Sequence, residues 1–171
     1  MPTCLLDKNV VRRAVEGIGR TQIGQPLTNE ERASLELLLA SEQGELTLFI
    51  SPEMQHILDR YGNHPDVQVF LRFVKVLRPA RYFKRWSRRL REHGFTREDG
   101  KVLALATFGT DPSATHLGAD QVATFDQALI NHFEHQQDHV TRRLKAMTAQ
   151  LHAPYNSATL PDVRSPHEIS L

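Results

Sequence analysis

The sequence predicts an α/β fold, a three-layer α/β/α sandwich built around a central, mostly parallel sheet. Short β-rich apolar runs alternate along the chain with segments that carry helix start signals, and this alternation favours parallel strands joined by helical crossovers. The length of 171 residues is that of one domain. Apolar residues make up 40% and charged residues 24%, which excludes the disordered and fibrous classes.

The chain opens with a strand, helix, strand pattern. Short apolar runs predict strands over Thr3–Leu6 and Leu46–Ile50. Between them, Thr28 and Glu31 have the spacing of a capping box, which predicts a helix over residues 29–43.

The next segment begins with another helix start signal. Ser51 precedes Pro52, so an N-cap residue stands before a proline at the first helical position, and a helix to about residue 61 is expected. Residues 65–74 are expected to form a further helix, and residues 74–77 a third strand.

A strongly basic stretch follows. Seven basic residues and no acid occupy it: Arg78, Arg81, Lys84, Arg85, Arg88, Arg89 and Arg91. Interleaved aromatic residues make this a candidate nucleic-acid surface, with Arg81, Lys84, Arg85, Arg88 and Arg89 as the expected contacts. The alternative is a solvated amphipathic helix that turns Phe83, Trp86 and Leu90 toward the core and ends near Gly94.

The second half repeats the alternation. Thr96 caps a buried helix, residues 109–118 form a loop, and Gln121–Phe125 forms a strand. Asp126 caps a polar helix that extends to about residue 151. Residues 1–151 are therefore expected to form the domain, with a basic helical region over 62–93, and residues 152–171 form a proline-containing tail that is able to add a last short strand.

Three aspartates fall where parallel strands deliver functional groups. Asp7 ends the first strand, Asp126 follows the strand over 121–125, and Asp99 lies in the first turn of a helix. Carboxylates gathered closely repel one another unless they share protons or bind divalent cations, and their oxygens suit Mg²⁺ or Mn²⁺. The alternative is that Asp99 and Asp126 only cap helices and that Asp7 only ends a strand.

Other chemistry finds little support. His132, His135 and His139 recur at helical spacing, but their polar surroundings are typical of a solvated helix face. Cys4 lies in an apolar strand, where a thiol is usually inert, and a single cysteine without a secretory signal suggests a reducing, cytoplasmic environment. No apolar run approaches the roughly 20 residues of a membrane span, so no membrane partner is expected.

Several segments resemble, in the right order, the motifs of PIN-domain proteins, a family of small metal-dependent ribonucleases that includes toxins of prokaryotic toxin–antitoxin pairs. Leu5–Val11 resembles the family's opening strand with its acid and asparagine, and Leu48–Glu53 resembles its second strand and turn. Gly94–Ala106 resembles the helix start that carries an acid, and Ala119–Asp126 resembles the strand with its Thr-x-Asp ending. Val163–Glu168 resembles the closing segment.

The resemblance implies site residues, a cofactor and partners. It assigns Asp7, Asp99 and Asp126 as ligands of Mg²⁺ or Mn²⁺, with Asn9 and Thr124 in support. RNA is the implied substrate. An antitoxin protein and a second copy of the chain are further expected partners.

Two positions depart from the family pattern. The family's second acid matches Ile57, and Glu53, one helical turn earlier, is the nearest acid able to replace it. Lys8 stands where a small hydroxyl residue is usual. The expected function is a metal-dependent endoribonuclease acting on single-stranded RNA; the alternative is a catalytically degenerate domain that binds RNA or a protein.

Overall fold

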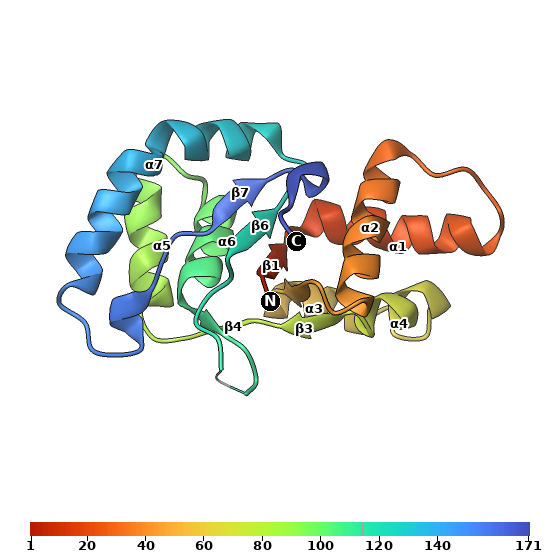
Figure 1. Ribbon diagram of the computed structural model, residues 1–171, viewed down its shortest axis with the longest axis horizontal. Helices are drawn as coiled ribbons and strands as arrows, with labels where there is room; N and C mark the ends of the chain where they lie inside the picture. The colour runs from red at the N-terminus through yellow and green to blue at the C-terminus, as the bar shows by residue number, and fades with distance from the viewer. Residues whose placement is uncertain (114) are drawn as a thin grey trace.

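The computed structural model describes residues 1–113 and 115–171 and confirms the predicted three-layer α/β/α architecture (Figure 1). Its centre is a five-stranded parallel sheet in the order β3-β2-β1-β6-β7. The strands are short, as their apolar runs predict, and comprise β1 (Thr3–Leu6), β2 (Thr47–Ile50), β3 (Val74–Val76), β6 (Gln121–Ala123) and β7 (Asp162–Arg164).

Alternating side chains of the strands build two hydrophobic cores on opposite faces of the sheet. Leu5 aligns with Phe49 on one neighbour and with Val122 on the other, and this row belongs to one core, whereas Cys4 and Leu6 belong to the other. Cys4 is fully buried, and burial raises the pKa of its thiol to about 12, as an inert core residue requires.

Helices cover both faces (Figure 1). The face of Cys4 is covered by α1 (Lys8–Gln22), α2 (Asn29–Glu42), α3 (Pro52–Asp59) and α4 (Pro65–Leu71). The face of Leu5 is covered by α5 (Phe83–Glu92), α6 (Arg97–Phe108) and α7 (Gln127–Thr148). Connections between parallel strands are right-handed. Connections that lead to strands on opposite sides of β1 therefore place their helices on opposite faces of the sheet.

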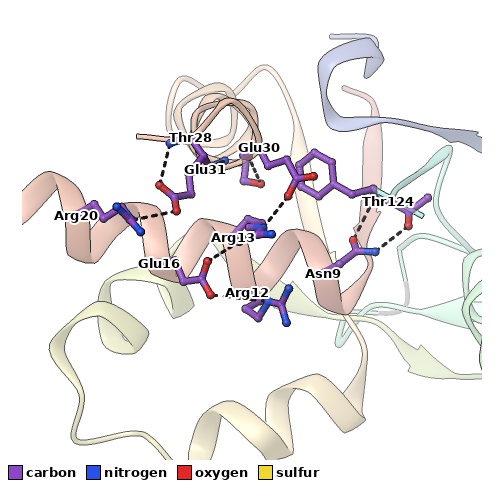
Figure 2. Close-up of polar contacts among 11 residues, drawn as sticks. Asn9, Arg12, Arg13, Glu16, Arg20, Thr28, Glu30, Glu31 and Thr124 are labelled. Carbon is purple, nitrogen blue, oxygen red and sulfur yellow. Dashed lines mark hydrogen bonds and ion pairs between the residues drawn. The ribbon is translucent and has the colours of Figure 1, made fainter. Parts of the chain in front are cut away.

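The predicted capping box at the start of α2 is confirmed. Thr28 Oγ1 accepts from the Glu31 amide at 3.1 Å, and the Thr28 amide donates to the Glu31 carboxylate at 3.1 Å. Glu31 is only 1% exposed, and Arg20 of α1 pairs with it at 3.1 Å. A second ion pair joins Arg13 to α2, so polar contacts fasten α1 and α2 above their apolar faces (Figure 2).

The basic region over 62–93 contains α4, β3, β4 (Arg78–Pro79) and α5. The strand β4 pairs antiparallel with β5 (Gly109–Thr110), so the prediction of a loop over the whole of 109–118 is wrong at its first two residues. Beyond these two residues, Asp111 accepts hydrogen bonds from Ser113, Thr115 and His116. Burial opposes ionisation of Asp111, but these donors outweigh it and hold its pKa well below the usual range.

The C-terminal segment returns to the sheet. After a single 3₁₀ turn (Tyr155–Ser157), β7 pairs with β6 in the register Val122 to Val163, and a second 3₁₀ turn (Pro166–Glu168) follows. Within the described residues, no helix combines the length and the apolar character needed to cross a membrane.

Candidate functional site

The parallel sheet brings chemically useful residues to one edge. Asp7 directly follows β1, Ser51 directly follows β2, and Thr124 directly follows β6. Because these neighbouring strands run in the same direction, their carboxyl ends meet. The chain passes from β1 to β2, its neighbour on one side, and later enters β6, its neighbour on the other side. At such a reversal of strand order the connections diverge to opposite faces of the sheet, and α/β sheets commonly bind ligands in the crevice between them.

Hydrogen bonds fix the orientation of Asp7. Thr124 Oγ1 donates to Asp7 Oδ2 at 2.8 Å, and the Lys8 amide donates to Asp7 Oδ1 at 2.8 Å. Thr124 is fully buried, and its hydroxyl accepts from Asn9 Nδ2 at 3.3 Å and from the Asp126 amide at 3.0 Å. With both acceptor sites used, the hydroxyl proton of Thr124 points to Asp7 Oδ2 and fixes the orientation of that carboxyl group.

Asn9 is held equally firmly. Its Oδ1 accepts from the Phe125 amide at 3.2 Å, and its Nδ2 donates to both Asp7 Oδ2 and Thr124 Oγ1 at 3.3 Å. Because one side of the amide meets a donor and the other meets two acceptors, only one assignment of the amide atoms satisfies the network. Figure 2 shows Asn9 at the start of α1, directed at Thr124.

Asp99 lies in the first turn of α6, partly buried. Its amide donates to Thr96 Oγ1 at 3.1 Å, so Thr96 is the predicted N-cap. Desolvation raises the pKa of Asp99, and repulsion from Asp126 and Asp7 raises it further, against opposing effects of the Thr96 hydrogen bond and of Lys8. Three carboxylates that are distant in sequence therefore share one electrostatic environment.

Asp126 is the exposed N-cap of α7, and its Oδ1 accepts from the Leu129 amide at 3.2 Å. Asp7 likewise occupies the N-cap position of α1. The structural roles of Asp7 and Asp126 therefore coexist with the shared site, whereas the alternative of Asp99 as a helix cap is wrong, because Thr96 caps α6. Helix N-termini directed at this edge also favour negative charge there.

A pocket of about 450 Å³ joins these elements. Asp7, Asp99 and Asp126 all line it, together with Glu53 from α3 and Lys101 from α6. Lys101 Nζ lies 3.1 Å from Glu53 Oε1. Glu53 thus reaches the predicted pocket, where its carboxylate is paired with an ammonium group.

The acids line the pocket without converging on one point. Within residues 1–113 and 115–171, no group of three or more His, Cys, Asp or Glu side chains stands ready to hold a metal ion in this conformation. Ile57, which matches the position of the second acid in PIN-domain proteins, lines the same pocket with 44% of its surface exposed.

The basic stretch forms the predicted amphipathic helix. Trp86 and Leu90 are fully buried, and Phe83 packs against the same core, so these apolar side chains build the core face of α5. Phe83 and Pro79 also line the pocket that contains Asp7, Asp99 and Asp126, called the acidic pocket from here on. The start of α5 therefore lies at the rim of this pocket.

The cations of α5 occupy its other face. Lys84, Arg85 and Arg88 are exposed, and so is Arg81 just before the helix. Arg81 lies 5.3 Å from the centre of the Tyr82 ring, and Arg89 pairs with Glu92 at 3.3 Å. Exposed positive charge suited to a polyanion contact is therefore present at Arg81, Lys84, Arg85 and Arg88.

The histidines of α7 have separate partners. His132 contacts the His93 carbonyl and the Phe95 ring, His135 contacts the Asn131 carbonyl, and His139 contacts Arg142. These contacts account for the three rings without a common ligand.

Two charged pocket residues were not anticipated from the sequence: Glu98 and Lys101. Both lie within two positions of Asp99 on α6, and helical spacing places them beside Val102 and Leu105, which line the pocket as well. The helical spacing of these residues relative to Asp99 could have predicted that they face the same pocket.

No protein-family model matches this chain, and comparisons with curated proteins and with solved structures give no significant match.

Proposed function

We propose that this protein is a metal-dependent endoribonuclease that hydrolyses phosphodiester bonds of single-stranded RNA, as its resemblance to PIN-domain proteins suggests. The observation that carries the proposal is the meeting of Asp7, Asp99 and Asp126 on one pocket, where burial raises the pKa of Asp99 and the charges of Asp126 and Asp7 raise it further. Asp7 and Asp126 keep their hydrogen bonds to the protein, and at the carboxyl edge of the parallel sheet they also repel Asp99, which is an arrangement typical of functional sites.

The chemistry of this pocket fits a hard divalent cation. Carboxylate oxygens are the ligands that Mg²⁺ and Mn²⁺ prefer, and binding a cation relieves repulsion that otherwise destabilises the site. Asp7, Asp99 and Asp126 would hold the ion, with Asn9 and Thr124 keeping Asp7 oriented. A bound cation supplies Lewis-acid charge stabilisation and a more acidic water molecule for phosphodiester hydrolysis.

The remaining pocket residues suit a phosphate substrate. Lys8 and Lys101 bring positive charge to the pocket, and Lys101 is able to exchange its contact with the exposed Glu53 for a phosphate oxygen. Exposed Lys84, Arg85 and Arg88 on α5 extend this positive charge from the rim. These residues would bind and orient the RNA backbone without reading its sequence.

A second candidate function is a non-catalytic module that binds RNA or a protein. It is favoured by Ile57 in place of the family's second acid and by the pairing of Glu53 with Lys101. The two candidates differ in whether the pocket binds a divalent cation.

Addition of Mn²⁺ is expected to stabilise the protein, because a ligand that binds only the folded state shifts unfolding by mass action. At about 100 times its dissociation constant, Mn²⁺ should raise the melting temperature by about 5–10 °C. Differential scanning calorimetry with Mn²⁺, with Ca²⁺ and with EDTA measures this shift. An unchanged melting temperature at millimolar Mn²⁺ favours the non-catalytic module.

Neutralising α5 is expected to weaken binding of single-stranded RNA and to reduce its salt dependence. Replacing Arg85 and Arg88 by Gln removes two phosphate contacts, so the slope of log affinity against log salt should decrease by about 1.4. The matched control replaces Arg32 and Arg72, two exposed arginines outside α5, and loses the same charge. Fluorescence anisotropy between low and moderate salt measures both, and equal slopes in the two variants would refute the role of α5.

A further inference from the structure

A second depression adjoins the acidic pocket. It has a volume of about 490 Å³ and is lined mainly by apolar side chains of α1, α3 and α4. Lys8, Asn9, Met54 and Ile57 line both depressions. The two depressions therefore adjoin at these side chains, and the second one, called the groove from here on, lies along α1 and α3.

The groove exposes apolar surface to solvent. Tyr61 is 62% exposed and Ile57 is 44% exposed, beside partly buried Met54. The Tyr61 amide donates to the Leu58 carbonyl at 2.9 Å, which fixes the backbone just beyond α3. An exposed aromatic ring beside an aliphatic wall suits a flat, weakly polar ligand, because such a ligand is able to stack on it.

The α1 wall of the groove carries two cations, Lys8 and Arg12, and one carboxylate, Glu16. Lys8 and Arg12 lie one helical turn apart and both line the groove. Arg12 is 66% exposed, and its Nε lies 3.8 Å from Glu16 Oε1, whereas the other oxygen of Glu16 lies 3.0 Å from Arg13 Nη1. Glu16 is thus held more closely by Arg13, and the guanidinium of Arg12 remains accessible to an anion.

We propose that this groove is a nucleotide subsite, in which an unpaired base of single-stranded RNA stacks on Tyr61 while Lys8 and Arg12 contact its phosphates. The inference rests on the proposed function, because it places a neighbouring nucleotide beside the phosphodiester bond at the acidic pocket. A volume of about 490 Å³ is suited to a nucleotide-sized ligand. The two cations beside the apolar floor favour a nucleic acid over an apolar protein segment, and stacking on Tyr61 requires a base free of its helix.

Binding without cleavage tests this subsite. The protein is titrated in EDTA with two hexanucleotides of equal length and charge, one carrying 2-aminopurine at its centre and one abasic there. Because stacking of one base on an aromatic ring contributes substantially to affinity, the base-containing strand should bind about tenfold more tightly and its fluorescence should be quenched on binding.

Variants assign the difference to the groove. Tyr61→Ala should bind both strands with equal affinity and without quenching, whereas Tyr61→Phe should behave as the native protein. Lys8→Gln with Arg12→Gln should weaken both strands equally and keep their ratio. The matched control is Leu39→Ala, which removes another exposed apolar side chain, on α2 and outside the groove, and should change nothing.

Either of two results would overturn the subsite: equal affinity of the native protein for both strands, or an unchanged preference in Tyr61→Ala. A groove that binds an apolar peptide while Tyr61→Ala leaves the strand preference intact would likewise contradict it. The titration needs neither metal nor turnover. The absence of Mn²⁺-dependent cleavage would therefore contradict the proposed function without deciding whether the subsite binds a base.

Discussion

Replacing Asp99 by Asn is expected to lower RNA cleavage by at least about 100-fold, because the substitution deletes a ligand charge at almost constant volume. The same change should leave the metal-free melting temperature no lower than that of the native protein. The pKa of Asp99 is raised, so its protonated form is favoured by folding. The stability that protonation of Asp99 contributes is fully present below the ordinary carboxyl pKa and is lost as the pH rises through the raised pKa. Asn does not ionise, so this loss of stability at higher pH is absent in the variant.

The combination of lost activity and retained stability separates a functional acid from a helix cap. A residue that only stabilises the first turn of α6 would, when replaced, lower stability and leave cleavage intact. The matched control is Glu36→Gln, which neutralises an exposed acid of α2 that does not line the pocket. Cleavage that survives in Asp99→Asn, or that falls equally in Glu36→Gln, would contradict the assignment of Asp99.

Truncation of Trp86 should produce the largest loss of stability among the residues of α5. Trp86 is fully buried between α5 and the core, so Trp86→Ala is expected to cost about 3–5 kcal/mol in the free energy of unfolding. Because this side chain anchors the helix that carries Arg85 and Arg88, RNA affinity should fall as well. Urea denaturation followed by circular dichroism measures the first effect, and anisotropy measures the second.

Trp86→Phe provides the control. Among the buried side-chain nitrogen and oxygen atoms of the described residues, Trp86 Nε1 has no hydrogen-bond partner. An unpaired buried N–H costs about 1–3 kcal/mol, so phenylalanine offsets part of the lost packing by removing it. The net cost of Trp86→Phe should therefore be roughly 1 kcal/mol. Equal losses in the Ala and Phe variants would show that ring packing does not anchor α5.

Local chemistry made much of the fold predictable. The capping box at Thr28, the Ser51-Pro52 helix start and the caps at Thr96 and Asp126 act over three or four residues, and each opens a helix in the structure. Short apolar runs likewise mark the strands, because parallel strands are buried on both faces.

The helix α1 was not predicted. Its buried positions, among them Val10, Ala14 and Ile18, have helical spacing, but Gly17 and a set of β-branched residues lower its intrinsic preference for helix. Tertiary packing overrides that preference. A Cβ at Gly17 would lie 3.1 Å from Leu35 Cδ1, so the glycine permits close approach of α2.

Asp7, Asp99, Asp126 and Glu53, which the sequence singled out, line one pocket, but the contacts among the pocket residues were not predictable. That Asp7 and Asp126 follow strands is visible in the sequence, but their proximity depends on β1 and β6 being neighbours in the sheet. The pairing of Glu53 with Lys101 joins residues that are 48 positions apart, and no local pattern encodes it. The Asn9 and Thr124 network likewise arises from the sheet order.

Cleavage of labelled single-stranded RNA by the purified native protein, with Mn²⁺ and with EDTA, tests the proposed metal-dependent nuclease most directly. The expected result is cleavage with Mn²⁺ that stops in EDTA and is absent in Asp99→Asn, which excludes a contaminating nuclease. Cleavage that persists in EDTA, or no cleavage by folded protein with Mn²⁺ present, would contradict the proposed function.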